Sequence, residues 1–423
     1  MSEVGVTGSQ VLKTEERSVS LNAGRPAWLL GPALVAGVAY LDPGNVAVNM
    51  SAGAHFGYLL VWVLVVANVA AWLVQYMSAK LGLATGRSMA ELLGERIGTR
   101  TGRVLYGIQA QFVAVATDIA EIIGGAVALW ILFDIPLVAG AVITGAVSTV
   151  LLLVQSERGA KAFEFSIIAL MAIIVIGFCY GLVISPPEAA QVAGGLLPRF
   201  DGTQSVLLAA SIMGATVMPH AIYAHSSLAR DRFAHTEIPA RRLIRATRVD
   251  VTIALSIAGS VNLVMLLVAA TVLPGVPGTD SLEGAHLAIQ NALGATAGSM
   301  FAIALLASGL ASTAVGSYAG SDILGGLFRT RLSLLTRRLL TMIPAVLVLA
   351  AGVDPTAALV LSQVVLSFGI PFAVVPLVWL TSRRKLMGAY RNTTALTAAG
   401  WLVAGAIVAL NVALLAMQLG LVG

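Results

Sequence analysis

The chain has 423 residues, of which 58% are hydrophobic and only 11% are charged, and its mean hydropathy is +0.91. A soluble domain carries about 25% charged residues, so this composition excludes an ordinary soluble protein and indicates a polytopic membrane protein in the lipid bilayer. The net charge of +5 reflects loop topology, described below, and does not indicate nucleic-acid binding.

Eleven apolar stretches are each long enough to cross a hydrocarbon core of about 30 Å. They cover roughly residues 28–50, 58–81, 104–132, 137–154, 162–184, 204–228, 249–273, 296–324, 339–353, 356–380 and 393–421. No connecting segment is long enough for a second domain. We therefore expect a flexible cytoplasmic tail over residues 1–25 and a single transmembrane domain over residues 26–423.

The basic residues indicate how the chain is oriented. Of the 25 lysines and arginines, all but Arg199 lie in or beside loops on one side of this topology. The loops on the other side carry the acids Asp134, Glu188, Asp201, Asp280, Glu283 and Asp354. The positive-inside rule then predicts a cytoplasmic N-terminus and an external C-terminus. The alternative reading of the acidic loops is that they attract cations to the outer face.

The first span is interrupted by Asp42-Pro43-Gly44-Asn45. Proline removes a helix hydrogen bond and glycine frees the backbone, so the break releases carbonyls such as that of Ala39. Such groups are tolerated in a membrane only when they are buried in protein or line a cavity. Because a carboxylate at membrane depth is functional by default, Asp42 and Asn45 are predicted cation ligands. The alternative is that Asp42 only caps the inner half-helix.

The third span holds two acids, Asp118 and Glu121, which are three residues apart and so share one helical face. Two neighbouring carboxylates in a medium of low dielectric constant cannot both be cheaply ionised, so the pair is suited to taking up and releasing protons. The nearest obvious counter-charges are Arg337 and Arg338, at the inner end of span nine. A static ion pair is the alternative.

The sixth span is interrupted by Met218-Pro219-His220, and this second break releases carbonyls such as that of Ala215. Together with Asp42 and Asn45, the Met218 thioether favours a softer divalent transition metal such as Mn²⁺ or Fe²⁺ over Mg²⁺ or Ca²⁺. His220 has two open roles, as a proton carrier or as a hydrogen-bond donor to a released carbonyl.

Other polar residues within the spans carry weaker signals. Glu164, Asp250 and Asp322 each have a lysine or arginine close by in the sequence, so local ion pairs are predicted for all three. Gln363 in span ten is a neutral polar residue of the kind that forms hydrogen bonds between membrane helices.

The two breaks fall in the first and sixth spans, so two five-span halves each begin with an interrupted helix. A repeat with an odd number of spans enters the membrane from opposite sides, which gives an inverted pair over about residues 28–184 and 204–380. The eleventh span, at about residues 393–421, lies outside the repeat. Broken helices at corresponding positions of two such halves are typical of a transporter site near the midplane.

The residues that carry a family resemblance are Asp42-Pro43-Gly44-Asn45, the stretch from Gly214 to His220, the acids of span three, Arg337-Arg338 and Gln363. In these residues the chain resembles the Nramp (bacterial MntH) divalent-metal transporters, and the resemblance extends over nearly its whole length. The resemblance implies an all-α, LeuT-like fold with a 5+5 inverted repeat plus an eleventh helix. It also implies proton-coupled import of Mn²⁺, and of Fe²⁺ and similar metals, across a bacterial plasma membrane, with no cofactor beyond the transported ions.

The resemblance also assigns roles to residues. It implies metal ligands at Asp42, Asn45, Met218 and the carbonyls of Ala39 or Ala215, with Gln363 joining in some states. It places Asp118, Glu121, His220 and Arg338 on the proton route.

Three other functions remain as alternatives. A transporter of the same fold for an amino acid or organic cation is disfavoured because the thioether and oxygen ligands suit a metal better than an amine. A zinc-dependent membrane protease would need a His-Glu-x-x-His motif, which the sequence lacks, so we expect no enzyme. A channel is disfavoured because the sequence shows one dense set of ligands and no repeated ring of charges.

Overall fold

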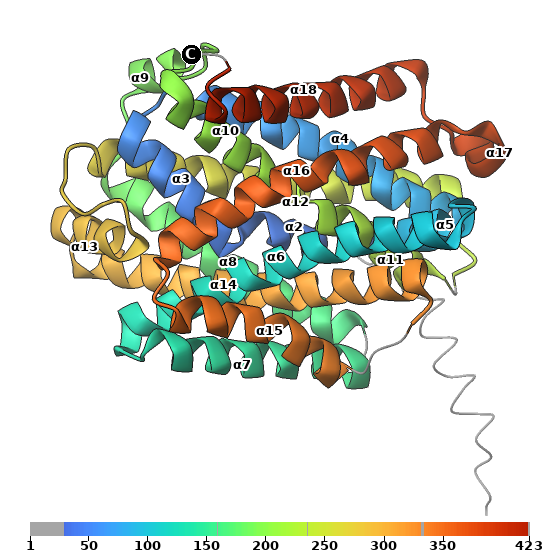
Figure 1. Cartoon of the computed structure of the whole chain (residues 1–423), viewed down its shortest axis with the longest axis horizontal. Coiled ribbons are helices and arrows are strands. Elements are labelled where there is room, and N and C mark those ends of the chain that lie inside the picture. The colour runs from blue at the N-terminus through green and yellow to red at the C-terminus, as the bar shows by residue number, and fades with distance from the viewer. Residues whose placement is uncertain (1–28, 159, 235, 331–333, 422–423) are drawn as a thin grey trace, which may run out of the picture.

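The computed structural model describes residues 29–158, 160–234, 236–330 and 334–421, and describes side chains throughout these ranges except at 152, 154–158, 160–162, 334–335 and 337–338. The predicted tail, residues 1–25, lies outside the described residues. Within the described ranges every regular element is a helix (Figure 1).

The helices follow the predicted spans closely. The first half of the chain forms α2 (Pro32–Val38), η2 (Ala39–Leu41), α3 (Pro43–Phe56), α4 (Val61–Thr85), α5 (Met89–Arg96), α6 (Arg100–Phe133), α7 (Leu137–Arg158), α8 (Ala160–Ile184) and α9 (Ala189–Gly194). The second half forms α10 (Gly202–Thr216), α11 (Pro219–Phe233), α12 (Ala240–Val272), α13 (Leu282–Leu293), α14 (Ala295–Ile323), η3 (Leu324–Phe328), α15 (Leu334–Ala350) and α16 (Pro355–Ser382). The chain ends with α17 (Arg384–Met387), η4 (Gly388–Tyr390) and α18 (Thr394–Gln418).

In the described part of the chain, eight helical segments are long and apolar enough to cross a membrane. The α10–α11 pair forms one of these segments. The other three predicted spans correspond to the interrupted pair α2–α3 and to the helices α7 and α15, which contain shorter apolar stretches. An all-α membrane bundle is therefore the observed architecture.

The packing of the helices supports the inverted repeat. In the two halves α3, α4, α6 and α8 correspond to α11, α12, α14 and α16. The contact between α3 and α12 therefore has its counterpart in that between α11 and α4, and the contact between α6 and α16 in that between α14 and α8. The contacts of α6 with α14 and of α7 with α15 map onto themselves. All of these contacts are present, so the two halves pack as related units with both interrupted helices at the centre.

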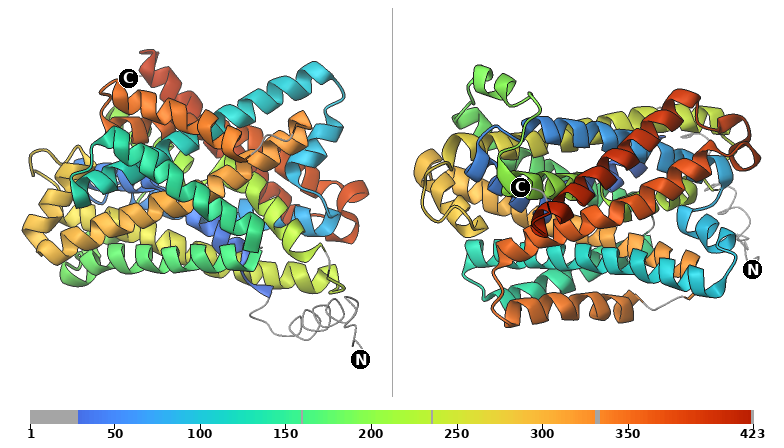
Figure 2. Two further views of the ribbon diagram at one scale, coloured as in Figure 1. Left: turned by 90° about the horizontal axis from the view of Figure 1, so that it is seen from below. Right: turned by 45° about the horizontal axis from the view of Figure 1, so that its top comes forward.

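The eleventh span lies at the outside of this arrangement. Figure 2 shows α18 alongside α16 at one side of the bundle, and α18 also contacts α10 and α4. Much of its apolar surface is exposed, including Leu402 at 74% and Val412 at 59%. This exposed face is suited to contact with lipid.

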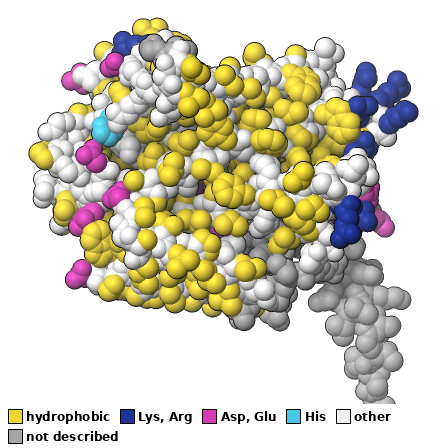
Figure 3. All heavy atoms as spheres, in the orientation of Figure 1, with side chains coloured by type: hydrophobic (Ala, Val, Ile, Leu, Met, Phe, Trp, Pro, Cys, Tyr) yellow, Lys and Arg dark blue, Asp and Glu magenta, His cyan; other side chains and the backbone are white. Residues whose placement is uncertain are grey.

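The two ends of the bundle carry opposite charges. In Figure 3 lysines and arginines gather at the end that holds α5 and α17, acidic residues gather at the end that holds α9 and α13, and the surface between them is largely hydrophobic. We call these the basic end and the acidic end. This pattern is the spatial form of the charge asymmetry seen in the sequence.

Hydropathy did not predict the short connecting helices, and two of them, α5 and α13, begin with a serine cap. The first, α5, begins with a capping box in which Ser88 Oγ accepts from Glu91 N and the Glu91 carboxylate accepts from Ser88 N. The second, α13, begins with Ser281, which accepts from Gly284 N at 3.0 Å. Both helices lie outside the spans, where a search for long apolar runs does not find them.

Candidate functional site

The first break lies at Asp42, as predicted. The helix ends at Leu41, Asp42 has an extended backbone (φ −67°, ψ 162°), and α3 begins at Pro43. The Asp42 carboxylate accepts from the Asn45 backbone N–H at 2.8 Å and so caps α3. The alternative role of Asp42 as a helix cap is therefore present, and the capped helix is the half that follows the break.

The carbonyls around this break are held by protein groups. Ala39 O accepts from Asp42 N at 3.3 Å, and Tyr40 O accepts from Asn262 Nδ2 at 2.8 Å. Ser308 Oγ of α14 donates to Leu41 O. The released backbone groups are therefore paired inside the bundle, as a membrane interior requires. Sequence reasoning missed Ser308, whose only signal is a hydroxyl in an apolar span.

The second break lies at Met218 and is joined directly to the first. Here α10 ends at Thr216, Met218 has an extended backbone (φ −67°, ψ 119°), and α11 begins at Pro219. The Ala215 carbonyl, freed by this break, accepts from Asn45 Nδ2 at 2.8 Å. Two segments 170 residues apart in the sequence thus form one centre.

A third helix, α16, completes the surroundings of Asp42. Gln363 Nε2 lies 3.4 Å from Asp42 Oδ2, while Asn45 Nδ2 donates to Asp42 Oδ1 at 2.7 Å. A methyl carbon built on Gly44 would lie 1.8 Å from Gln363 Nε2, so the glycine leaves open the space that the Gln363 amide occupies beside the break. The interhelical hydrogen bond expected for Gln363 is therefore present, and its partner is Asp42.

The centre is closed to solvent and polar. Asp42, Asn45, Met218 and Gln363 are each at most 1% exposed. Among the described residues, Asn45 Oδ1, Gln363 Oε1 and Thr216 Oγ1 are buried oxygens without a hydrogen-bond partner. A buried acceptor without a partner is costly, and a cation would satisfy several of them at once.

The donor set differs from that of a resident metal centre. In the part of the chain that the structure describes, no group of three or more histidine, cysteine, aspartate and glutamate side chains could hold a metal ion. The polar groups joined around Asp42 are instead one carboxylate, two amides and a backbone carbonyl. Such a set binds more weakly than a cluster of thiolates and imidazoles, which suits an ion that must also be released.

The two acids of span three face the same neighbour. Asp118 and Glu121 lie on α6 and are 4% and 0% exposed. A methyl carbon built on Gly316 of α14 would lie 2.7 Å from Glu121 Oε2 and 3.2 Å from Asp118 Oδ1. Both carboxylates therefore converge on one glycine. The side chain of Arg338, the expected counter-charge, lies outside the described residues.

His220 connects the second break to this acidic helix. Its Nδ1 lies 3.1 Å from the hydroxyl of Thr117, the residue before Asp118 in α6. Its Nε2 is buried and has no hydrogen-bond partner among the described residues. Of the two open roles for His220, the hydrogen bond to a released carbonyl is not the contact observed, since its partner is a side chain of α6.

For Glu164 and Asp250 the structure shows partners far away in the sequence, while the side chain of Lys161, the local cation beside Glu164, lies outside the described residues. Asp250 of α12 accepts from Gly31 N at 3.2 Å and from Ala33 N at 2.9 Å, so it caps α2 from another helix. Glu164 lies 3.1 Å from Arg232 of α11. Both contacts hold half-helices of the broken spans to their neighbours at the basic end.

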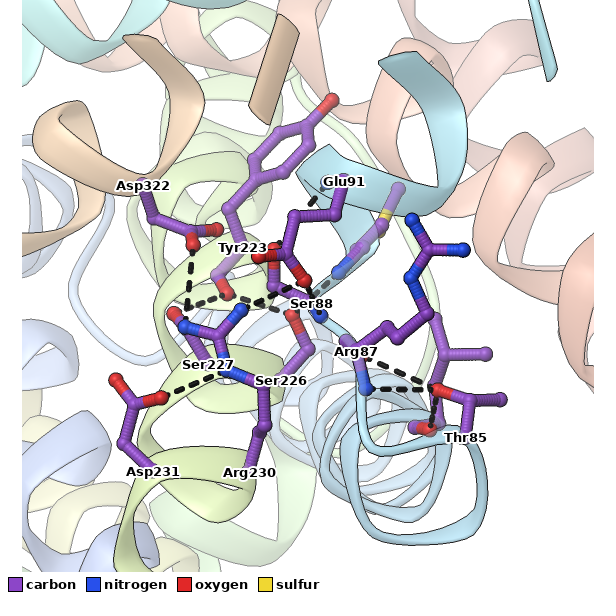
Figure 4. Close-up of polar contacts among 12 residues, drawn as sticks. Thr85, Arg87, Ser88, Glu91, Tyr223, Ser226, Ser227, Arg230, Asp231 and Asp322 are labelled. Atoms are coloured by element: carbon purple, nitrogen blue, oxygen red, sulfur yellow. Dashed lines mark hydrogen bonds and ion pairs between the residues drawn. The ribbon is translucent and has the colours of Figure 1, made fainter. Parts of the chain in front are cut away.

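Asp322 belongs to a polar cluster at the basic end (Figure 4). Arg230 of α11 lies 2.7 Å from Glu91 of α5 and 3.9 Å from Asp322 of α14. Tyr318 donates to Asp231 at 2.7 Å, beside a cavity of about 580 Å³ that these residues line. This cluster joins α5, α11 and α14 on the side of the bundle where the basic loops lie.

Comparisons with known proteins agree with these features. The family model described as natural resistance-associated macrophage protein-like matches residues 33–417. The divalent metal cation transporter MntH of Mycobacterium tuberculosis is 57% identical over 390 residues, which cover 92% of this chain and 91% of the relative.

Solved structures give the same result for the fold. The crystal structure of the Eremococcus coleocola manganese transporter in complex with an aromatic bis-isothiourea substituted compound aligns with a TM-score of 0.81 at 30% identity, covering 93% of this chain and 87% of that one. The structure of MhsT in complex with L-phenylalanine has a TM-score of 0.60 at 14% identity, covering 92% of this chain and 97% of that one, which bears on the fold alone. The expected LeuT-like fold is thus confirmed.

Proposed function

The chain belongs to the Nramp family of membrane transporters, and from this premise we propose that it imports divalent transition metal ions, Mn²⁺ foremost and Fe²⁺ and similar metals besides, together with protons. The names of its relatives, divalent metal cation transporters and a manganese transporter, support the cargo. We propose a transporter and not an enzyme.

The observation that carries this proposal is the hydrogen bond between Asn45 Nδ2 and Ala215 O, beside Asp42 and within three residues of Met218. It brings a carboxylate, an amide and a freed carbonyl together at one buried centre. The buried Met218 follows Ala215 by three residues in the same break, and this supports its thioether as a further ligand. In our proposal the metal replaces Asn45 Nδ2 at the carbonyl, with the amide turned to present its oxygen. Asp42, Asn45, Met218 and Gln363 and the carbonyls of Ala39 and Ala215 are the proposed ligand set.

Protons are proposed to follow α6. His220 lies in the second break and contacts Thr117, the residue before Asp118 in α6, and this contact supports a proton route between the break and the acid pair. Asp118 and Glu121 both face Gly316 of α14. Uptake of one proton by this pair would relieve the repulsion between the two carboxylates. Arg338 is the proposed counter-charge for the ionised pair.

The orientation follows from the charges. We propose that the basic end faces the cytoplasm of a bacterium, with the N-terminus inside and the C-terminus outside an integral plasma membrane protein. The Asp250 cap on α2 and the Arg230 cluster then lie on the cytoplasmic side. Metal release on this side requires α2 to leave the Asp250 cap, while the closed centre opens on one side at a time.

Uptake into proteoliposomes with an internal pH dye and an internal metal dye tests cargo and coupling together. We expect saturable Mn²⁺ uptake, competition by Fe²⁺, little competition by Ca²⁺ or Mg²⁺, and acidification that follows the metal. Non-saturating metal uptake, or competition by amino acids, would overturn the cargo. Metal uptake with no acidification would overturn the coupling alone.

A further inference from the structure

A second cavity, separate from the transport centre, lies at the basic end between α4, α12 and the segment that joins η4 to α18. It has a volume of about 230 Å³. Its polar lining consists mainly of three cations and three aromatic rings: Trp72, Tyr76, Lys80, Arg248, Tyr390 and Arg391. We call it the basic-aromatic pocket. Among the residues that the structure describes, no aspartate or glutamate lines it.

The lysine of this pocket is buried and held in place. Lys80 is 4% exposed, and its ammonium donates to Asn392 Oδ1 and lies 5.3 Å from the centre of the Tyr76 ring. Asn392 is fixed in turn, because its Nδ2 donates to Thr381 Oγ1 at 2.8 Å and its N–H donates to Thr381 O at 2.9 Å. The position of Lys80 is therefore built into the fold.

A second cation shares the same ring. The Arg248 guanidinium lies 5.5 Å from the centre of the Tyr76 ring. Aromatic faces stabilise cations only modestly, so two positive groups on one ring still repel each other. An anion between them would remove that repulsion.

The charge of the pocket is not balanced by protein. Among the described residues, no carboxylate lies within 4 Å of Lys80, Arg248 or Arg391. Other cations at the basic end do have acidic partners, as Arg230 has Glu91. A buried, unbalanced ammonium is costly, so the pocket as built is suited to an anion with several acceptor oxygens.

The surroundings of the pocket point to a lipid as the source of that anion. Along α4, α12 and α18 the outward surface continues in exposed apolar side chains, with Val69 58%, Ile253 40% and Leu402 74% exposed. Trp72 and Tyr76 are residue types that concentrate at the membrane–water interface. The pocket thus lies where an apolar, lipid-facing surface meets the basic end.

We propose that the basic-aromatic pocket binds the phosphate group of an anionic phospholipid, whose acyl chains lie along α4, α12 and α18. A volume of about 230 Å³ is below that of pockets for drug-sized ligands and fits a small group such as a phosphate ester. Basic pockets between membrane helices bind phospholipid headgroups in this way. The bound lipid would link α18, which lies outside the repeat, to α4 and α12.

The test measures retained lipid by native mass spectrometry on the full chain, purified in detergent with equal amounts of phosphatidylglycerol and phosphatidylcholine. We expect one phosphatidylglycerol retained in preference to phosphatidylcholine. Each cation adds about 1 kcal/mol for an anionic lipid, so Arg248→Gln and Arg391→Gln should each lower the preference about fivefold. Lys80→Met should lower it at least as much, and the two arginine variants keep the test valid if this buried change impairs folding.

The matched control is Arg245→Gln, which removes the same charge from an exposed position on α12 that does not line the pocket. It should keep the preference. An equal loss in Arg245→Gln and Arg248→Gln would overturn the pocket in favour of a diffuse surface charge. A second arm adds inorganic phosphate to the lipid-free protein. Phosphate binding at millimolar concentration without any phosphatidylglycerol preference would overturn the lipid as the source.

Discussion

The two proposed ion sites differ in the backbone that carries them. Asp42 lies where α2 and α3 separate, and the neighbouring Met218 lies where α10 and α11 separate. Asp118 and Glu121 lie instead on α6, which runs unbroken from Arg100 to Phe133 and packs against α14 at Gly316. A metal ion needs several ligands at one point, and in our proposal the breaks supply them from side chains and freed carbonyls, whereas a proton needs only a carboxylate that changes its charge.

Because the two sites lie on different helices, we expect separate mutations to affect metal binding and proton movement. Changes at the breaks should remove metal binding, and with it the proton movement that follows the metal. Changes on α6 and α14 should spare metal binding and alter only the protons. The four predictions below test this division.

The largest effect is expected for Asp42→Ala. It removes the only carboxylate of the metal centre, so Mn²⁺ uptake should fall about 100-fold or more, beyond the loss typical of outer-shell changes. Metal-driven acidification should vanish with it. Uptake of ⁵⁴Mn into proteoliposomes measures the effect.

Asp354→Ala is the matched control, because Asp354 also caps a helix that begins with proline. The exposed Asp354 carboxylate accepts from Ala357 N at 2.7 Å at the start of α16. Its loss should cost about 1 kcal/mol of stability and leave uptake intact. Equal loss of uptake in both variants would mean that Asp42 acts only as a cap.

Asp118→Ala should separate the two ions. Mn²⁺ binding measured by calorimetry should remain, while the acidification that accompanies uptake falls to background, because the acid pair can no longer exchange a proton. Asp134→Asn, at the exposed end of the same helix, should change neither signal. Normal acidification in Asp118→Ala would contradict the proposed proton route along α6.

Gly316→Ala should weaken the same step without removing a carboxylate. The added methyl would lie 2.7 Å from Glu121 Oε2, and overpacking of this kind costs about 1–3 kcal/mol. We expect acidification to slow about tenfold while Mn²⁺ binding is kept. Gly320→Ala, one turn along α14 with its nearest contact at 3.9 Å, should behave as wild type. Identical behaviour of the two variants would contradict the convergence of both acids on Gly316.

The smallest effect on uptake is expected for Met218→Ala. Mn²⁺ uptake should persist on the oxygen ligands, but its preference over Ca²⁺ should fall at least about tenfold, because the thioether favours only the softer metal. Met213→Ala, also buried in the sixth span, should keep the preference. Competition of ⁴⁵Ca with Mn²⁺ measures the ratio, and an unchanged ratio in Met218→Ala would remove the sulfur argument.

The sequence was informative wherever a local rule decides the structure. Asp42-Pro43-Gly44 and Met218-Pro219 break their helices where predicted, because proline cannot continue a helical hydrogen-bond ladder. The presence and order of the long helices followed from apolar length, although several helices extend beyond the predicted spans, as α12 does by beginning at Ala240. The resemblance to a known family supplied the LeuT-like fold.

Such local rules could not predict the hydrogen-bond partners that depend on how the helices pack together. The predicted partner of Asp250 was Arg248, yet Asp250 caps α2, some 219 residues away. His220 meets Thr117 and not a carbonyl, and Ser308 holds the carbonyl of Leu41 from another helix. Neighbours in sequence predict helix faces, but they do not reveal which face of which helix comes to lie opposite.

The central claim is that the two breaks hold one metal ion between them. X-ray absorption at the manganese edge of the Mn²⁺-loaded, full-length protein tests it most directly, since Met218 is the only proposed sulfur ligand. The account predicts a shell of oxygen ligands with one sulfur in the wild type, the loss of that sulfur in Met218→Ala, and no bound Mn²⁺ in Asp42→Ala. A wild-type shell of oxygen and nitrogen alone, unchanged in Met218→Ala, would contradict it.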